Sequence, residues 1–66
     1  EPLTSRELDV LELLARRLTN QEIADKLFIA PTTVKEHLKS IYQKLDVNKR
    51  REAVEKAQKI WILSGG

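Results

Sequence analysis

Apolar side chains recur along the first part of the chain at the spacing of an amphipathic helix. The repeating positions are Leu8, Leu11, Leu14, Ala15 and Leu18. Spacings of three and four residues place such side chains on one face, so the pattern predicts a first helix over about residues 5–17. Thr4 stands three residues before Glu7, and this pair is typical of the capping box that begins a helix.

The same start signal returns at Thr19 and Glu22 and predicts a short second helix directly after the first. Its inner face carries the apolar residues Ile23, Ala24 and Leu27. Pro31 suits the first position of a new helix, because the amide that proline lacks has no partner there. Residues 28–30 are therefore expected to form a short apolar turn between two helices.

A third helix of about four turns is predicted from Pro31 onward, because a single apolar stripe runs along this segment. The stripe consists of Val34, Leu38, Ile41 and Leu45. Residues 46–49 interrupt the pattern, and a fourth helix is expected over about residues 50–62. Its apolar side is wide and comprises Ala53, Val54, Ala57, Ile60 and Trp61, extended by Ile62 and Leu63. The predicted fold class is all-α, with four helices.

A short helix, a tight turn and a longer helix with a polar outer face form the arrangement that places one helix in the major groove of DNA. Ala24 fits this arrangement, because two helices that cross steeply need a small residue where their backbones approach. The outer face of the third helix offers hydroxyl, cationic, carboxylate and amide groups from Thr32, Lys35, Glu36, Lys39 and Gln43. We therefore expect the third helix to be the recognition helix of a helix-turn-helix domain.

Length and composition restrict the class of protein. With 66 residues, 41% of them hydrophobic, the chain has room for one core, and residues 1–66 are expected to form a single domain. A domain this small is marginally stable, which favours a C-terminal module of a larger regulator. The sequence has no cysteine and no apolar run long enough to span a membrane. A cytoplasmic location is therefore expected, with no membrane partner.

The net charge of +2 says little until its distribution is considered. Residues 35–51 hold six cations and two acids, whereas residues 1–34 hold four cations and six acids. This asymmetry predicts one surface that attracts phosphates. A charge run on an ordinary solvated face would have the same composition, and charge alone does not decide between the two.

Catalytic and metal-binding motifs are not found in the sequence. There is no glycine-rich phosphate loop and no nucleophile beside a base, so we expect neither an enzyme nor a cofactor. His37 is the only histidine, and without acidic or cysteine residues in register it is interpreted as a packing or hydrogen-bonding residue.

Several linked motifs resemble the LuxR-type (GerE-like) helix-turn-helix domain over nearly the whole chain. They are LTSREL at residues 3–8, NQEIA at 20–24, TVKEH at 33–37 and KL at 44–45. Within this family the chain is most similar to the C-terminal domain of MalT-type bacterial regulators, through APTTV at 30–34, IYQKL at 41–45 and AVEKAQ at 53–58. The resemblance implies a winged-helix-like fold without a wing, whose third helix reads the major groove of a promoter site.

The resemblance also implies roles for individual residues. Lys35, Glu36 and Lys39 fall at positions that contact bases and neighbouring phosphates. Backbone contacts or helix-end positioning are implied for Asn20, Thr32, Thr33 and Lys44, and a phosphate contact or a structural ion pair for Arg50. The fourth helix is expected to form a homodimer on double-stranded DNA through part of the set Val54, Ala57, Trp61 and Leu63. Contact with RNA polymerase, as in a transcription activator, is a further expectation.

Departures from the family pattern lie at the helix ends. Ala30 replaces the usual serine before the proline, which removes a side-chain cap worth about 1 kcal/mol. Arg17 and Asp46 replace glycines that commonly follow the first and third helices, and Arg51 replaces a small hydroxyl residue. None of these changes removes the polar face of the third helix.

Two other functions remain open at this point. The promoter-reading domain of a sigma factor shares the start of the first helix and the Glu-Ile-Ala core of the second. Such domains end with the recognition helix, however, whereas this chain continues into a fourth amphipathic helix. A helical protein-interaction module, whose polar face meets an acidic partner, is the alternative from another class.

Overall fold

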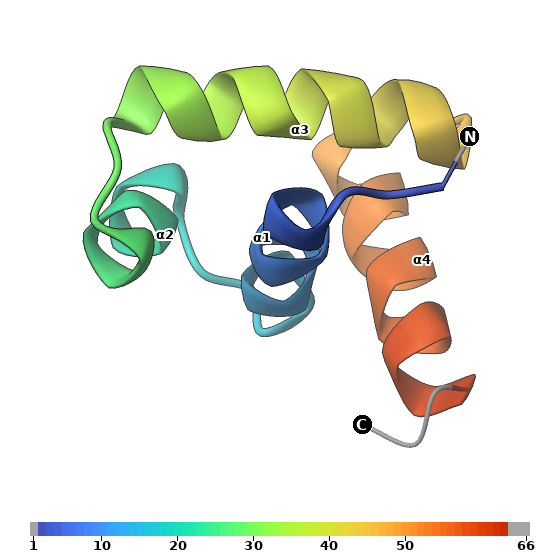
Figure 1. Ribbon diagram of the computed structural model, residues 1–66. Helices are drawn as coiled ribbons and strands as arrows, with labels where there is room; N and C mark the ends of the chain where they lie inside the picture. The colour runs from blue at the N-terminus through green and yellow to red at the C-terminus, as the bar shows by residue number, and fades with distance from the viewer. Residues whose placement is uncertain (1, 64–66) are drawn as a thin grey trace.

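Four helices make up most of the computed structural model, which describes the backbone of residues 2–63 and the side chains of residues 2–60 (Figure 1). The helices are α1 (Ser5–Ala15), α2 (Asn20–Leu27), α3 (Pro31–Leu45) and α4 (Arg50–Leu63). The described backbone contains no strand, so the prediction of an all-α fold with four helices is confirmed. Over the described residues, no helix combines the length and the apolar character needed to cross a membrane.

The predicted capping boxes begin α1 and α2. At α1 the Thr4 hydroxyl accepts a hydrogen bond from the Glu7 amide at 3.1 Å, and the Glu7 carboxylate accepts one from the Thr4 amide at 2.8 Å. Thr19 and Glu22 repeat both bonds at the same distances at the start of α2. The N-cap residue of α3 is Ala30, which makes no side-chain hydrogen bond. The start of α3 therefore relies on the preset backbone of Pro31.

Each of the first three helices ends in a left-handed residue that is not glycine. These residues are Arg17, Phe28 and Asp46, with φ angles of 64°, 57° and 57°. The next amide donates back into the helix, from Leu18 to Leu13 O (3.3 Å), from Ile29 to Ala24 O (3.1 Å) and from Val47 to Tyr42 O (3.0 Å). These bonds are typical of Schellman motifs, which are frequently accompanied by an apolar contact from the residue after the left-handed one. The end of α1 at Ala15, two residues before the predicted end, follows from this cap.

The core forms around α1, which contacts all three other helices. It consists of Val10, Leu11, Leu13, Leu14, Ile23, Ala24, Val34, Leu38, Ile41, Val47, Ala53, Val54 and Ala57. The expectation that Leu8 lies on the buried face is wrong, since 49% of this residue is exposed. Because α1 packs against several helices, its buried arc is centred on Val10 and Leu14 instead of following one narrow stripe.

Side chains of α4 fix the C-terminal ends of two other helices. The Lys56 ammonium donates to the carbonyl of Leu45 at 2.6 Å, at the end of α3. The Gln58 amide donates to the carbonyl of Ala15 at 3.0 Å, at the end of α1. Carbonyls in the last turn of a helix have no partner within it, so these bonds satisfy acceptors that would otherwise need water.

Candidate nucleic-acid interface

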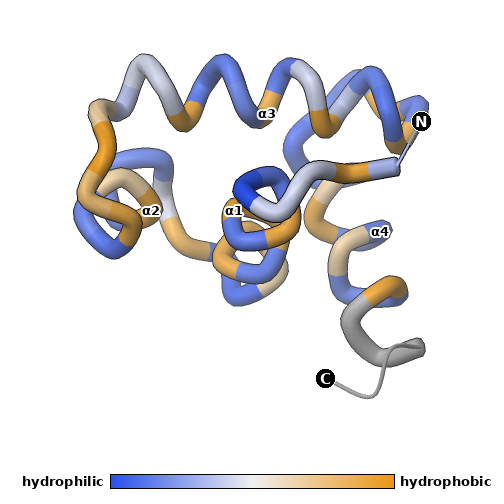
Figure 2. Tube along the Cα trace, in the orientation of Figure 1, coloured by the Kyte–Doolittle hydropathy of each residue, from blue (hydrophilic) through white to orange (hydrophobic). Residues whose placement is uncertain are grey.

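The helix α3 has one buried side and one exposed side, as its sequence pattern predicts. Val34, Leu38 and Ile41 are buried against the other helices. Figure 2 shows the apolar positions of α3 on the side that faces α1 and α2, and polar positions on the opposite side. The exposed residues on α3 include the predicted contacts Thr32, Lys35, Glu36, Lys39 and Gln43, whereas Thr33 is half-buried.

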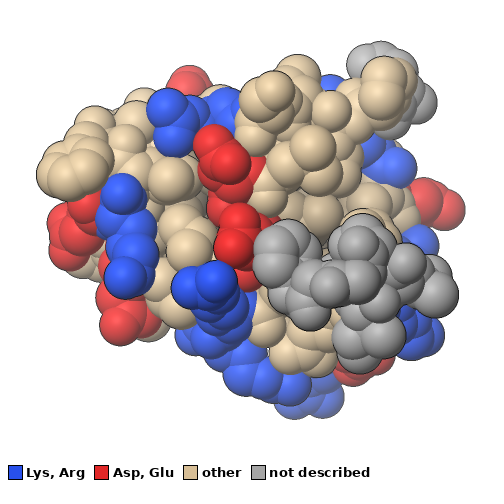
Figure 3. All heavy atoms as spheres, turned by 60° about the horizontal axis from the view of Figure 1, so that its bottom comes forward, with Lys and Arg blue, Asp and Glu red and all other residues tan. Residues whose placement is uncertain are grey.

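The charged groups on this exposed side have no internal partners. Across residues 2–60, the ion pairs are Arg6 with Asp9, Arg16 with Glu12 and Lys44 with Glu7. Lys35, Glu36 and Lys39 are in none of them. The face seen in Figure 3 carries both acidic and basic side chains. The outer side of α3 is therefore a surface whose cations are free to meet an anionic partner.

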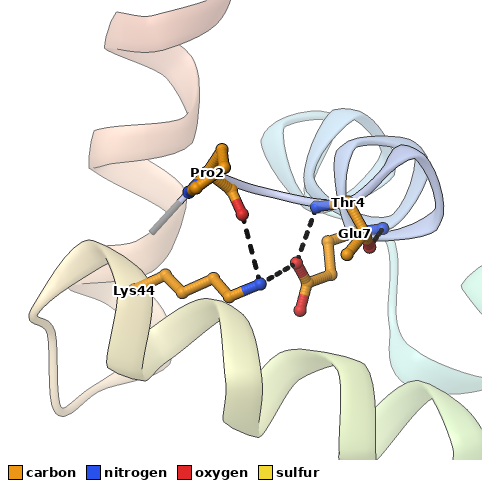
Figure 4. Close-up of polar contacts among 4 residues, drawn as sticks. All are labelled: Pro2, Thr4, Glu7 and Lys44. Atoms are coloured by element: carbon orange, nitrogen blue, oxygen red, sulfur yellow. Dashed lines mark hydrogen bonds and ion pairs between the residues drawn. The ribbon is translucent and has the colours of Figure 1, made fainter.

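Lys44, for which the family resemblance implies either a DNA-backbone contact or helix-end positioning, has an internal partner in the structure (Figure 4). Its ammonium donates to the Glu7 carboxylate at 2.7 Å and to the Pro2 carbonyl at 3.3 Å. The Glu7 side chain is 5% exposed and the Lys44 side chain 16%. Hydrogen bonds from Lys44, from Ser40 and from the Thr4 amide lower the pKa of Glu7 from 4.5 to about 2.

This geometry does not favour Lys44 as a phosphate contact, because its charge is already compensated by a carboxylate. The contact instead joins the C-terminal part of α3 to the segment that precedes α1. The sequence could not indicate this partner, since Glu7 already had a role in the capping box at Thr4 and lies 37 positions away. Lys44 therefore holds the position of α3.

Arg50, at the first position of α4, bridges two elements through neutral acceptors. One guanidinium nitrogen donates to the side-chain oxygen of Asn20 and the other to the carbonyl of Leu18, both at 2.6 Å. Asn20 is the first residue of α2, so the bridge ties the start of α2 to the start of α4. Neither acceptor is charged, and the positive charge of Arg50 is therefore not compensated by its partners. The family resemblance implies either a phosphate contact or a structural ion pair for Arg50. In the structure Arg50 has a structural role, but through hydrogen bonds to neutral acceptors and not through an ion pair.

An open pocket of about 290 Å³ brings several of these residues together. It is lined by Asn20, Lys35, Leu38, Lys39, Tyr42 and Arg50. Tyr42 and Leu38 are absent from the residues that the sequence assigned to the site. Lys35, Lys39 and Tyr42 share a helical flank, since they are spaced by four and three residues on α3. That spacing is the signal in the sequence that places Tyr42 beside Lys35 and Lys39, and in the structure Tyr42 also packs against the core.

The dimer prediction for α4 needs correction at two positions. Val54 and Ala57 are 7% and 1% exposed, because they pack in the core of the domain. A second copy cannot reach them without unfolding this packing, so they are core residues and not a dimer surface. The other two predicted residues, Trp61 and Leu63, have side chains outside the described residues. On the described part of α4, Ile60 is a large apolar residue with substantial exposure, at 37%.

Within the described ranges, no group of three or more histidine, aspartate or glutamate side chains could hold a metal ion. The outer side of α3 offers hydrogen-bond donors and cations. Such a surface binds anions and the polar edges of bases.

Comparison with known proteins agrees with this geometry. The model of the family described as GerE, bacterial regulatory proteins of the luxR family, matches residues 1–57. The HTH-type transcriptional regulator MalT of Yersinia pestis is 45% identical over 64 residues, which are 97% of this chain and 7% of that protein. MalT of Vibrio cholerae is 44% identical with the same coverage. This chain thus spans 7% of the length of these relatives.

A solved structure is similar over most of the fold. The response regulator ChrA, from a heme-sensing two-component system, superposes with a TM-score of 0.82 and 42% sequence identity. The match covers 89% of this chain and 29% of the ChrA chain. The resemblance inferred from the sequence motifs is confirmed, and the family match favours it over a sigma-factor domain. The chain belongs to the luxR family of bacterial regulatory proteins and is a helix-turn-helix domain of the DNA-binding kind found in transcriptional regulators.

Proposed function

We propose that the domain recognises a specific sequence of duplex DNA by inserting the outer side of α3 into the major groove. The observation that carries this proposal is the unpaired polar face of α3, which lies opposite an apolar face that packs against the rest of the domain. A lysine side chain reaches the acceptors of guanine in the major groove, and a glutamate can accept from the amino group of cytosine. Lys35, Glu36 and Lys39 therefore supply both kinds of base contact.

The residues around α3 divide into two groups by the contacts available to them. Those that face outward read the groove, namely Thr32, Lys35, Glu36, Lys39 and Gln43. Those at the flanks, Asn20, Thr33 and Arg50, position the duplex through its backbone. Phosphate contacts supply affinity without sequence information, whereas base contacts supply selectivity. Lys44 belongs to neither group, because Glu7 holds its ammonium.

We propose that this domain brings the whole regulator to a promoter in the cytoplasm. A homodimer on DNA would use residues of α4 outside the core, where Ile60 is exposed. We further propose that the regulator activates transcription by contacting RNA polymerase. The MalT relatives are much longer than this chain, so the inducing signal belongs to segments other than this domain.

In vitro selection of bound duplexes from a random library tests the proposed function. We expect enrichment of one sequence, and the distance between its half-sites shows whether two copies bind with two-fold symmetry. Enrichment of no sequence, together with no retardation of random duplex at low salt, would overturn DNA binding. That outcome would favour an acidic protein partner for the face of α3.

A matched pair of variants then tests the position of the reading face. Lys39→Ala is expected to weaken binding to the selected duplex by roughly 1–3 kcal/mol, and to affect a scrambled duplex less. Lys59→Ala removes an exposed lysine from α4, away from the face of α3, and should bind both duplexes like the parent chain. Equal binding by Lys39→Ala and the parent would show that the reading face lies elsewhere.

A further inference from the structure

Phe28 is the most exposed large apolar residue among residues 2–60, with 94% of its surface open to solvent. It also has a left-handed backbone, with φ 57° and ψ 43°, at the end of α2. This conformation is costly for a bulky residue, whereas glycine and asparagine adopt it more readily. The ring therefore gains nothing from burial within the domain, while the backbone carries strain of the kind that clusters at functional sites.

The turn between α2 and α3 is apolar over five consecutive residues, which we call the turn patch. They are Leu27, Phe28, Ile29, Ala30 and Pro31. Phe28, Ala30 and Pro31 are exposed, and the other two are half-buried against the core. Figure 2 shows these apolar positions along the turn. Single apolar residues on a surface need no explanation, whereas a contiguous patch with a large exposed ring points to an interaction site.

The turn patch lies away from the reading face and away from α4. Phe28 ends α2, and α2 packs against the inner side of α3, so a duplex on the outer side of α3 leaves the ring uncovered. Figure 1 shows the turn at one end of α3 and α4 at the other end. Because α3 lies in the groove in the proposed complex, its ends point along the groove. The turn patch is therefore directed at a protein on a neighbouring site.

The size of the turn patch does not favour a stable complex free in solution. A standard interface takes about 20–30 residues from each partner, far more than this turn provides. Two proteins joined by so small a contact associate weakly unless another molecule holds them side by side. A shared duplex does so, because it raises the effective concentration of one protein at the other.

The charges beside the turn patch favour a second copy of this chain as the partner. Asp25 and Lys26 precede the patch, both are exposed, and neither belongs to an ion pair within residues 2–60. The only side-chain hydrogen bond that Asp25 makes with the described residues comes from the neutral amide of Gln21. Two identical surfaces around a two-fold axis place one residue opposite a different residue of the other copy, and the reverse. Asp25 of each copy can then face Lys26 of the other while the two apolar turns cover each other.

We propose that Phe28 anchors a contact between two copies of this domain on neighbouring DNA sites, with their turn patches packed together around a two-fold axis. The inference rests on the proposed function, because the duplex holds the two copies side by side. It goes beyond that function by adding cooperativity between sites. The contact is separate from the proposed homodimer through α4, since the turn patch and α4 lie at opposite ends of α3 (Figure 1).

Titration of duplexes with one and with two half-sites tests this contact. The selected half-site is placed once, or twice as an inverted repeat, in both inverted orders and at spacings over one helical turn of about 10 base pairs. In one order, we expect the parent chain to bind the second half-site about tenfold more tightly than a single one. This factor is smaller than burial of a whole phenylalanine side chain would give, because ordering of the two turns opposes it.

Phe28→Asn removes the ring and supplies a residue that tolerates the left-handed backbone. It should bind the single half-site within about twofold of the parent chain, as expected for a surface substitution, and should lose the cooperativity. Lys59→Ala, on α4, is the matched control and should keep it.

Charge reversal tests the two-fold arrangement. Asp25→Lys and Lys26→Asp should each reduce the cooperativity, because like charges then face each other across the contact. The double variant should restore it, since the opposite charges are exchanged on both copies. Comparing two half-sites with one removes any general effect of these charges on DNA affinity.

Several results would overturn the contact while DNA binding stands. They are independent binding at every spacing in both orders, and cooperativity that Phe28→Asn retains. Loss of cooperativity in the single charge variants without recovery in the double variant would refute the two-fold arrangement. If the parent chain binds no duplex even at low salt, the proposed function and this inference fail together.

Discussion

Replacing Asp46 by glycine tests how much stability the domain loses through the residue that ends α3. Asp46 has φ 57° and ψ 51°, and its amide donates to the carbonyls of Gln43 and Tyr42. Its side chain is exposed, so the substitution removes no core contact. The carboxylate also lies at the C-terminal end of a helix, where the helix dipole favours cations over anions. Both features of Asp46 therefore act against stability.

The expected gain can be worked from these two features. A left-handed conformation costs an L-residue roughly 1–2 kcal/mol, less for aspartate than for most residues, and glycine avoids this cost. Glycine loses more backbone entropy on folding, which opposes the gain by roughly 0.5–1 kcal/mol. Removing the carboxylate from the helix end contributes about 0.3–1 kcal/mol. We expect Asp46→Gly to raise the free energy of unfolding by about 1 kcal/mol, which corresponds to a Tm rise of about 4–8 °C for a domain of this size.

Urea and thermal unfolding of the parent chain, Asp46→Gly and Asp46→Ala would measure both contributions. The alanine variant loses the carboxylate but keeps the Cβ atom, so it should be less stable than the glycine variant by about 1 kcal/mol. Equal stability of the two variants would refute the argument from the left-handed backbone. DNA affinity should not change in either variant, because Asp46 does not line the pocket.

Three further predictions concern the helix starts and the core. The pKa of Glu7 is lowered to about 2, so its stabilising contribution is complete above about pH 4.5 and is lost as the pH falls toward 2. In Glu7→Gln, unfolding in acid should therefore take up one proton fewer, and the free energy of unfolding should depend less steeply on pH in this range. Urea titrations at a series of pH values measure this dependence, and the same dependence in the variant and the parent would contradict the prediction. Ala30→Ser should supply the missing cap of α3 and stabilise the domain by about 1 kcal/mol in thermal melts, whereas Ala30→Val should not. Ala24→Leu should lower the free energy of unfolding by about 1–3 kcal/mol in urea titrations, since Ala24 is 1% exposed and α2 packs on α3. Unchanged stability would contradict the close packing of the two helices at this residue.

Local signals in the sequence were sufficient for the fold class and for most element boundaries. The capping pairs at Thr4 and Thr19 lie within four residues of the helix starts they define, and both form as predicted. The stripe along α3 was also predicted correctly, because one helix face packs against the rest of the domain over its whole length. The exposed polar face of α3 follows from the same periodicity.

The interactions of the cations, in contrast, were decided by tertiary structure. Lys44 and Arg50 are both basic residues near the C-terminal end of α3, and nothing in their immediate sequence separates them. Lys44 meets a carboxylate 37 positions away, and Arg50 meets a neutral amide oxygen 30 positions away. Burial of Val54 and Ala57 likewise depended on which helix would pack on α4.

By itself, the sequence determined where helices begin, which faces are apolar and which family the chain resembles. These properties depend on neighbours within one or two turns, so a periodic pattern and a capping pair are sufficient to specify them. Only the tertiary structure decided which cations remain available to an anionic partner. That outcome depends on contacts between residues far apart in the chain, because a charge is available only when the fold brings no opposite charge beside it.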